Sequence, residues 1–138
     1  MGATLTQHSD LMRAVVSHVG IYDMLRVELS PNGVFNIPEF GTVQDPEQFR
    51  ALYAYSPYHQ VKDGVRYPAM LFLTGANDPG VDDMQSRKIV ARLQAASASD
   101  EPIFLRASSN TGRAADTPRA MLDSSSSRKV CRPLLNHS

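Results

Sequence analysis

The hydrophobic pattern along the chain predicts three β-strands. Residues 14–19 (AVVSHV) form a short run rich in β-branched side chains, which Gly20 closes. Residues 69–74 (AMLFLT) form an apolar run without a charge, which is typical of a strand buried on both faces of a sheet. Residues 103–107 (IFLRA) follow Pro102 and form the third run.

Two segments carry the signals of amphipathic helices. In the first, Asp45 can cap the N-terminus, Pro46 suits the first helical position, and Gln48 stands three residues after the cap. Its expected apolar face consists of Phe49, Leu52 and Tyr53, and the helix should end near Ser56-Pro57. The second helix should run from Asp82 to about residue 97, with Asp82 and Gln85 as a capping pair. Its expected apolar face is Met84, Ile89, Val90, Leu93 and Ala96.

The order of these elements predicts an α/β fold with a parallel sheet. Strand, loop, helix and strand over residues 69–107 favour a right-handed βαβ crossover. Residues 30–41 (SPNGVFNIPEFG) are dense in Pro, Gly and Asn, which indicates a surface loop. Parallel sheets are stable when helices cover both faces, and three strands with few helices leave one lateral edge bare. Because a bare apolar edge invites pairing, we expect association through the exposed sheet edge.

Composition indicates a globular domain and narrows the possible partners. Of the 138 residues, 42% are hydrophobic and 20% are charged. Lys plus Arg equals Asp plus Glu, with 14 of each, so no net field draws the chain to nucleic acid or anionic lipid. The apolar runs are too short for a membrane span. We therefore expect no nucleic-acid partner and no membrane partner.

The even charge balance hides a break near residue 113. Residues 1–112 hold 9 basic and 12 acidic side chains, whereas residues 113–138 hold 5 basic and 2 acidic ones. All ten Phe and Tyr residues precede position 113. A segment with so little apolar surface does not offset its ordering entropy. We therefore expect one domain over 1–112 and an unrelated, disordered tail over 113–138.

Cysteine usage and the start of the chain say little about the compartment. Cys131 is the only cysteine, which excludes an internal disulfide and a thiolate zinc cluster. The start, MGATLTQHSDL, lacks the basic and apolar parts of a secretory signal, and Met1-Gly2 alone is a poor match for myristoylation. The cytoplasm is the expected compartment by default.

Four stretches together resemble the catalytic domain of the prolyl oligopeptidase family. They are RAVVSHVGIYDMLR, EFGTVQDPEQFRALYAYSPYHQV, YPAMLFLTGANDPGVDDMQSRKIVARLQ and IFLRASSNTG, and their order fits the family from residue 1 to about Gly112. The resemblance implies an α/β-hydrolase fold, of which this chain would hold the last three strands of a mainly parallel sheet. It also implies serine-type hydrolysis of short peptides, often after proline, with no metal or organic cofactor.

The resemblance places only the acid of the family's Ser, Asp, His triad within the chain. The segment GANDPGV matches the acid loop of the family, with Asp78 at the acid position, although Asn77-Asp78-Pro79 is also ordinary turn chemistry. Met1-Gly2-Ala3 resembles the helix that follows the serine elbow, so the elbow would lie upstream. No G-x-S-x-G pattern occurs in the 138 residues.

Two further family positions are altered. Gly80 stands where the family usually has an arginine that helps to bind substrate, and glycine offers neither charge nor side-chain donors. Arg113 stands where the family has the catalytic histidine, and a guanidinium that stays protonated cannot act as a general base. A reading-frame disruption near codon 113 would explain both this change and the break in composition.

No other residues are expected to replace the missing groups. We interpret the four histidines as surface or core residues: His8, His18, His59 and His137. The serines at 108–109 and 124–127 lack an elbow or a nearby base. Asp78, Asp82 and Asp83 do not have the spacing of a calcium loop, and helix capping by Asp82 or Asp83 is the better interpretation. The basic group Arg87, Lys88 and Arg92 is interpreted as a solvated helix face.

The leading hypothesis is therefore a fragment of a serine oligopeptidase that is inactive alone. Two alternatives stay open. The chain could be a half-domain that complements a partner carrying the serine elbow, or a non-catalytic interaction module that has reused the α/β half-sheet.

Overall fold

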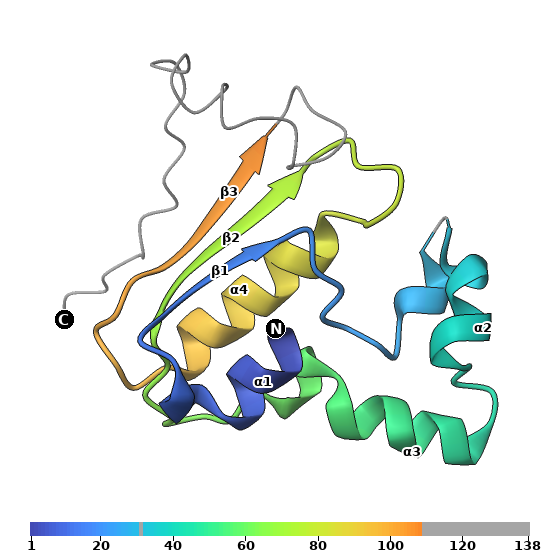
Figure 1. Cartoon of the computed structure of the whole chain (residues 1–138), viewed down its shortest axis with the longest axis horizontal. Helices are drawn as coiled ribbons and strands as arrows, with labels where there is room; N and C mark the ends of the chain where they lie inside the picture. The colour runs from blue at the N-terminus through green and yellow to red at the C-terminus, as the bar shows by residue number, and fades with distance from the viewer. Residues whose placement is uncertain (31, 109–138) are drawn as a thin grey trace, which may run out of the picture.

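A three-stranded parallel sheet organises the described part of the chain (Figure 1). The computed structural model describes residues 1–30 and 32–108. The strands β1 (Ala14–His18), β2 (Ala69–Gly75) and β3 (Ile103–Ser108) lie side by side in that order, and both pairings are parallel. The three predicted strands and the α/β fold class are thus confirmed. The predicted tail, residues 113–138, lies outside the described residues.

Within the described residues, four α-helices and four 3-10 turns connect and flank these strands. The α-helices are α1 (Gly2–Gln7), α2 (Ile37–Phe40), α3 (Pro46–Tyr55) and α4 (Met84–Ala96). The 3-10 turns are η1 (Ser9–Leu11), η2 (Val27–Leu29), η3 (Gly33–Asn36) and η4 (Pro57–Gln60). In Figure 1, α4 lies along one face of the sheet with α1 beside it, whereas α2 and α3 extend away from the sheet.

The main core lies between the sheet and α4. Side chains alternate between the two sides of each strand, so Val15, Met70 and Ile103 stand in one register row, and all three are buried. Phe72 on β2 and Leu93 on α4 are fully enclosed. Tyr22 packs edge-on against Phe72, with ring centroids 5.5 Å apart.

The opposite face of the sheet is open among the described residues. The neighbouring register row joins Val16, Leu71 and Phe104, of which Val16 is 54% exposed and Phe104 is 51% exposed. No described helix covers this row, and within residues 1–30 and 32–108 each outer strand pairs only with β2. The expected bare edge is therefore present, and one sheet face is bare as well.

The start of α3 confirms the capping prediction, but its apolar face is smaller than expected. The Asp45 side chain accepts the N–H groups of Glu47 and Gln48 at 2.8 and 3.0 Å. The Gln48 side chain does not return the bond to the cap; instead its Oε1 accepts the N–H of Thr42. The helix lies off the sheet against a small second cluster, so only Leu52 is buried. Phe49 and Tyr53 remain 40% and 47% exposed and stack on each other.

The second predicted helix begins at Met84 rather than at Asp82. Asp83 holds the N-cap position, but it is the Oδ1 of Asp82 that accepts the N–H of Met84, at 2.9 Å, and so caps the first turn. Four of the five expected apolar positions are buried, namely Ile89, Val90, Leu93 and Ala96, but Met84 in the first turn is 49% exposed. Gln85 takes no part in capping by its side chain and points inward, where it is buried.

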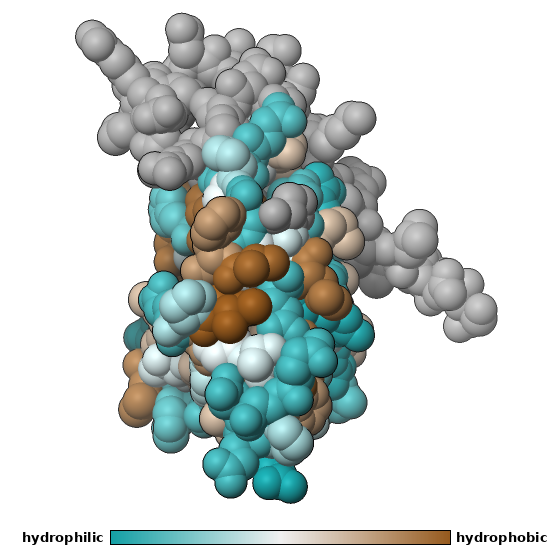
Figure 2. Space-filling view, turned by 90° about the vertical axis from the view of Figure 1, so that its right-hand side faces the viewer, coloured by the Kyte–Doolittle hydropathy of each residue, from teal (hydrophilic) through white to brown (hydrophobic). Residues whose placement is uncertain are grey.

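The predicted loop at 30–41 contains short helices instead of irregular backbone alone. The turn η3 and the helix α2 occupy most of it, and Gly41 ends α2 with a φ of +94° that favours glycine. The segment from η2 to α2 exposes three large apolar side chains, with Leu29, Val34 and Phe35 at 75%, 67% and 83% exposure. Figure 2, viewed from the side of α2 and α3, shows apolar side chains gathered among polar ones.

Two kinds of site are not found in this part of the chain. No helix in residues 1–30 and 32–108 combines the length and hydropathy needed to cross a membrane. Over the same residues, no three His, Cys, Asp or Glu side chains gather in a way that could hold a metal ion.

Candidate active site

Asp78 lies in the loop that leaves the carboxyl end of β2. The strand ends at Gly75, and the loop runs through Asp78 to Asp83 before α4 begins. One carboxylate oxygen of Asp78, Oδ1, accepts the main-chain N–H of Gly80 at 2.7 Å and that of Val81 at 3.1 Å. These two bonds hold the carboxylate against its own loop, so its orientation does not depend on a distant part of the chain.

The second oxygen of Asp78 is available for one further partner. Oδ2 is buried, and no described residue gives it a hydrogen bond. A buried acceptor without a partner is unfavourable, which is why such groups are rare outside functional sites. A carboxylate fixed through one oxygen and open at the other has the arrangement needed to accept an imidazole N–H and to stabilise its charged form.

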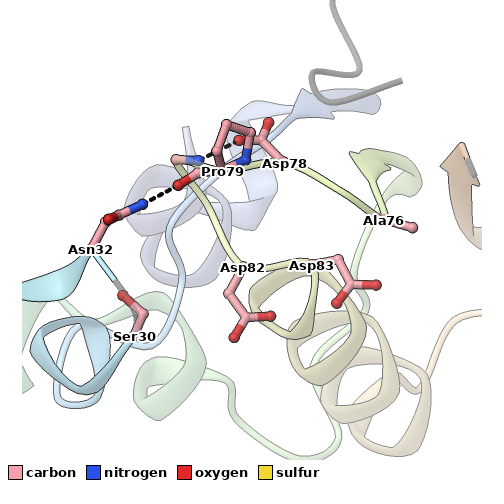
Figure 3. A pocket seen from close by; sticks show the side chains of 8 residues that line it. Ser30, Asn32, Ala76, Asp78, Pro79, Asp82 and Asp83 are labelled. Atoms are coloured by element: carbon pink, nitrogen blue, oxygen red, sulfur yellow. Dashed lines mark hydrogen bonds between the residues drawn. The ribbon is translucent and has the colours of Figure 1, made fainter. Parts of the chain in front are cut away.

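A pocket of about 380 Å³ lies beside this carboxylate (Figure 3). The acid loop forms one wall, and the segment between η2 and η3 forms the other through Ser30 and Asn32. The Asn32 side chain points to the carbonyl of Pro79 and donates a hydrogen bond to it. Asn32 thereby joins the two walls, a contact that the sequence pattern gave no reason to expect.

The other two carboxylates of the pocket have structural partners. Asp82 caps α4, and Asp83 Oδ2 accepts the N–H of Arg87 Nε at 2.7 Å. In Figure 3 the carboxylates of Asp82 and Asp83 point away from that of Asp78. Of the two residues interpreted as caps, Asp82 bonds the start of α4 with its side chain, whereas Asp83 holds the N-cap position without a side-chain capping bond.

Gly80 contributes no side chain to the pocket that it lines. A Cβ atom built at this position would lie 3.3 Å from Asp78 Oδ1, a close contact that a shift of a few tenths of an ångström relieves. The absence of arginine here is therefore a change of chemistry and not a steric necessity.

The histidine position expected from the resemblance, Arg113, lies outside the described residues, as does His137. His8 and His18 are exposed, and His59 is half-buried on η4. Since Asp78 Oδ2 has no described partner, none of these three side chains completes the acid with an imidazole.

A second polar cluster surrounds the buried Asp23, in the segment between β1 and η2. The Asp23 side chain is 1% exposed, and its Oδ2 accepts hydrogen bonds from Lys88 on α4 and from Arg26. Burial acts to raise the pKa of Asp23, but these bonds outweigh it and hold the pKa below its usual value. Lys88 was expected on a solvated face, and this was wrong, because its long side chain reaches inward to the carboxylate.

Ser56 and His59 complete this cluster without forming a triad. Ser56 Oγ lies 2.9 Å from His59 Nδ1, and Asp23 Oδ1 lies 3.8 Å from the same nitrogen. A catalytic imidazole needs the serine and the acid on opposite ring nitrogens. Ser56 is also fully buried, so no substrate reaches its hydroxyl. The sequence signal for this cluster was the acid of the GIYDML segment, which we did not single out.

Comparison with known proteins shows the family that this chain resembles. Residues 1–129 match the prolyl oligopeptidase family, Peptidase_S9. The prolyl endopeptidase of Elizabethkingia miricola is 37% identical over 116 residues, which covers 83% of this chain and 16% of that protein. The prolyl endopeptidase of Dictyostelium discoideum is 35% identical over 118 residues, with the same coverage of both chains. This chain thus spans about a sixth of the length of the curated relatives that it matches.

Solved structures give the same result for the fold. A structure from a study of two prolyl endopeptidases superposes with a TM-score of 0.76 at 41% identity, covering 83% of this chain and 18% of that one. Prolyl oligopeptidase B from Galerina marginata, bound to a 35mer hydrolysis and macrocyclization substrate, gives 0.76 at 26% identity over 82% of this chain and 16% of that one. The sheet and its flanking helices therefore correspond to part of an α/β-hydrolase domain.

The family match extends past Gly112, where we expected the resemblance to end. That boundary lies outside the described residues, so the division into 1–112 and 113–138 stays a prediction. The family itself rests on the match over residues 1–129, on relatives above 30% identity and on the superposed structures. This chain belongs to the prolyl oligopeptidase family of peptidases.

Proposed function

We propose that these 138 residues supply the triad acid of a serine-type oligopeptidase and do not hydrolyse peptides on their own. The observation that supports this most directly is the state of Asp78. Its Oδ1 is fixed by two main-chain N–H groups, and its buried Oδ2 has no partner among the described residues. A carboxylate in this state can accept a hydrogen bond from an imidazole N–H without losing the bonds that orient it.

The chemistry explains why an acid alone does nothing. In acyl transfer by a serine enzyme, the hydroxyl attacks the peptide carbonyl, the imidazole takes its proton, and the carboxylate stabilises the imidazolium. The 138 residues contain no serine elbow, and Arg113 cannot take a proton. Asp78 then has nothing to orient, and no step begins.

We propose short peptides as the substrates of the complete enzyme, with cleavage often after proline. The support is the naming of the relatives as prolyl endopeptidases and the 35mer peptide bound to the Galerina marginata enzyme. The proposed reaction proceeds through an acyl-enzyme and draws on no metal or organic cofactor. The cytoplasm is kept as the proposed compartment on the sequence alone.

A chimera tests the role of Asp78. Residues 1–108 of this chain would replace the matching segment of the Elizabethkingia miricola prolyl endopeptidase, so that the host supplies serine and histidine. Asp78→Asn should then lower kcat by about 10⁴-fold, because the amide holds the imidazole in the wrong tautomer.

Asp82→Asn is the matched control for that experiment. Asp82 lines the same pocket, but its carboxylate is engaged as a helix cap. The control should retain most of the activity of the chimera. Equal losses in the two variants, or no loss in Asp78→Asn, would remove Asp78 from the proposed role.

A second function, complementation of a partner chain, is supported by the open sheet. The row of Val16, Leu71 and Phe104 is uncovered among the described residues, and β1 pairs on one side only. Parallel sheets are stable when both faces are covered, so this surface favours association. Sedimentation velocity of the chain with and without the remainder of the Elizabethkingia miricola enzyme tests it. A stable one-to-one complex that Phe104→Glu abolishes is expected, and independent sedimentation would count against it.

A further inference from the structure

The Asp23 cluster contains two alternative sets of hydrogen bonds around one histidine. His59 Nδ1 faces Ser56 Oγ at 2.9 Å and Asp23 Oδ1 at 3.8 Å. Asp23 Oδ1 is buried and has no hydrogen-bond partner among the described residues. His59 Nδ1 thus lies between the Ser56 hydroxyl, which it contacts, and Asp23 Oδ1, which has no other hydrogen-bond partner among the described residues.

The Ser56 hydroxyl decides which ring nitrogen carries the proton in neutral His59. Ser56 Oγ accepts the N–H of Met24 at 3.1 Å, so its own proton must go elsewhere. The two available acceptors are His59 Nδ1 at 2.9 Å and the Tyr22 carbonyl at 3.3 Å. Because hydroxyl hydrogen bonds are strongest near 2.7–2.8 Å, Nδ1 is the better acceptor. Neutral His59 then carries its proton on Nε2.

Protonation must reverse that arrangement. The added proton binds at Nδ1, which can then no longer accept from Ser56. The Ser56 hydroxyl has the Tyr22 carbonyl as its alternative acceptor, and the new Nδ1–H has the unpartnered Asp23 Oδ1 within reach of a shift of about 1 Å. The Ser56 hydroxyl and the His59 Nδ1–H group therefore each have a nearby alternative acceptor.

We propose that His59 is a pH-sensitive switch: in its neutral form Nδ1 accepts from Ser56, and in its protonated form Nδ1–H donates to Asp23. The switch ties together two segments that are distant in sequence, namely the stretch after β1 and the junction of α3 with η4. It does not depend on the proposed function, because none of its groups belongs to the acid loop.

The groups that face His59 set the pH at which it changes. Burial lowers the pKa of His59, the nearby Asp23 opposes this, and the positive charges of Arg26 and Lys88 lower it further. The rings of Tyr53 on α3 and Tyr58 on η4 pack against the imidazole and shield it from water. The His59 pKa, and with it the pH at which the switch changes state, therefore lies below the usual histidine value.

The contact between η4 and α1 can transmit a shift of His59 to the first helix. Pro57, two residues before His59, lies so close to α1 that a Cβ at Gly2 would stand 2.8 Å from its Cγ atom. A displacement of η4 toward Asp23 must therefore alter the packing of the first turn of α1.

Nitrogen-15 NMR of the imidazole rings in the full 138-residue chain tests the switch, with the His59→Gln spectrum assigning the His59 signals. At pH 7.5 we expect a proton on Nε2 and none on Nδ1. On acidification, the amide signal of Gly2 and the side-chain carboxyl ¹³C signal of Asp23 should shift with the same midpoint as His59. A proton on Nδ1 at pH 7.5 would overturn the proposal. Gly2 and Asp23 signals that do not shift, or that shift with a different midpoint from His59, would also overturn it.

Two variants separate the switch from simple burial. Ser56→Ala removes the donor to the neutral ring and should raise the proton affinity of His59 about fivefold. Ser97→Ala should leave it unchanged, because the Ser97 hydroxyl bonds to Ser99 and, among the described residues, not to the Asp23 cluster. An unchanged or weaker proton affinity in Ser56→Ala, with wild-type behaviour in Ser97→Ala, would contradict the proposal. The tautomer of the wild-type chain decides the matter even if a variant fails to fold.

Discussion

The carboxylate of Asp78 and the main-chain N–H of Gly80 are joined by a hydrogen bond of 2.7 Å, so the acid is oriented before any base is present. The same glycine lines the pocket in place of the arginine expected from the family. One residue thus bonds the Asp78 carboxylate through its main chain and brings no side chain to the pocket.

Restoring arginine at this position should improve substrate binding in the chimera described above. A charge-assisted hydrogen bond of about 1.5–3 kcal/mol corresponds to a KM that is lower by roughly tenfold or more in Gly80→Arg. The change in kcat should be small, since the Asp78 bonds to the main chain are retained. Steady-state kinetics measures both constants.

Ala76→Arg is the control for that substitution, because Ala76 lines the same pocket and is exposed. It adds the same charge at a position where the family resemblance places no arginine. A similar fall in KM in both variants would mean that any positive charge near the pocket suffices.

Two phenylalanines on neighbouring strands should differ sharply in their effect on stability. Phe72 is fully buried and contacts Tyr22, so Phe72→Ala should cost about 3–5 kcal/mol of the free energy of unfolding. Phe104 is 51% exposed on the open face, so Phe104→Ala should cost less than about 1 kcal/mol. Urea denaturation followed by circular dichroism measures both. Comparable losses would show that the open face is covered in solution.

The cap of α3 should contribute measurably to stability. Asp45 accepts two main-chain N–H groups, and Asp45→Ala should lower the free energy of unfolding by about 1 kcal/mol. Asp45→Asn keeps an acceptor oxygen and should lose less than half of that. A thermal melt resolves the difference, and equal losses in both variants would assign the effect to charge and not to capping.

The sequence predicted the elements whose signals are local. The strand of residues 69–74 is an unbroken apolar run, and Asp45 with Pro46 is a cap that acts within one turn, so both were found. The exposure of Phe49 and Tyr53 could not be predicted in this way, because it depends on α3 lying off the sheet. The hydrophobic spacing shows which residues share a helix face, but it does not show which other elements pack against that face.

The same distinction holds for the polar groups. Asp78 was identified through the blocks around it, and its position after β2 follows from the strand. The inward path of Lys88 to Asp23 joins residues that are 65 apart in the sequence. The lack of a described partner for Asp78 Oδ2 also depends on which segments surround the loop. Gln85 likewise joins α4 to the main chain of Tyr22 and Asp23. Spacing along the chain carries no signal for such contacts.

Acidification should destabilise the fold in two steps. The pKa of His59 is lowered from its unfolded value of 6.5, so the unfolded chain binds that proton first, and stability falls as pH drops from about 6.5 toward the folded pKa. The pKa of Asp23 is lowered from 3.8, so its contribution is present above that value and is lost as pH falls through the folded pKa. Each step has a slope of at most about 1.4 kcal/mol per pH unit.

Urea titrations between pH 8 and pH 3 measure both steps, and two variants assign them. His59→Gln should remove the step that begins near pH 6.5. Lys88→Met should raise the pKa of Asp23 toward its unfolded value and so make the acidic step smaller, because a donor to Oδ2 is lost. Stability that rises on acidification over either range would contradict the assignment.

The most direct test of the central claim is active-site labelling of the purified 138-residue chain with a fluorophosphonate, alongside hydrolysis of a chromogenic prolyl peptide. The account predicts no labelled serine and no hydrolysis above the rate of buffer, because Asp78 has no imidazole to orient and no activated hydroxyl is present. A labelled serine together with peptide cleavage that co-purifies with this chain would contradict it.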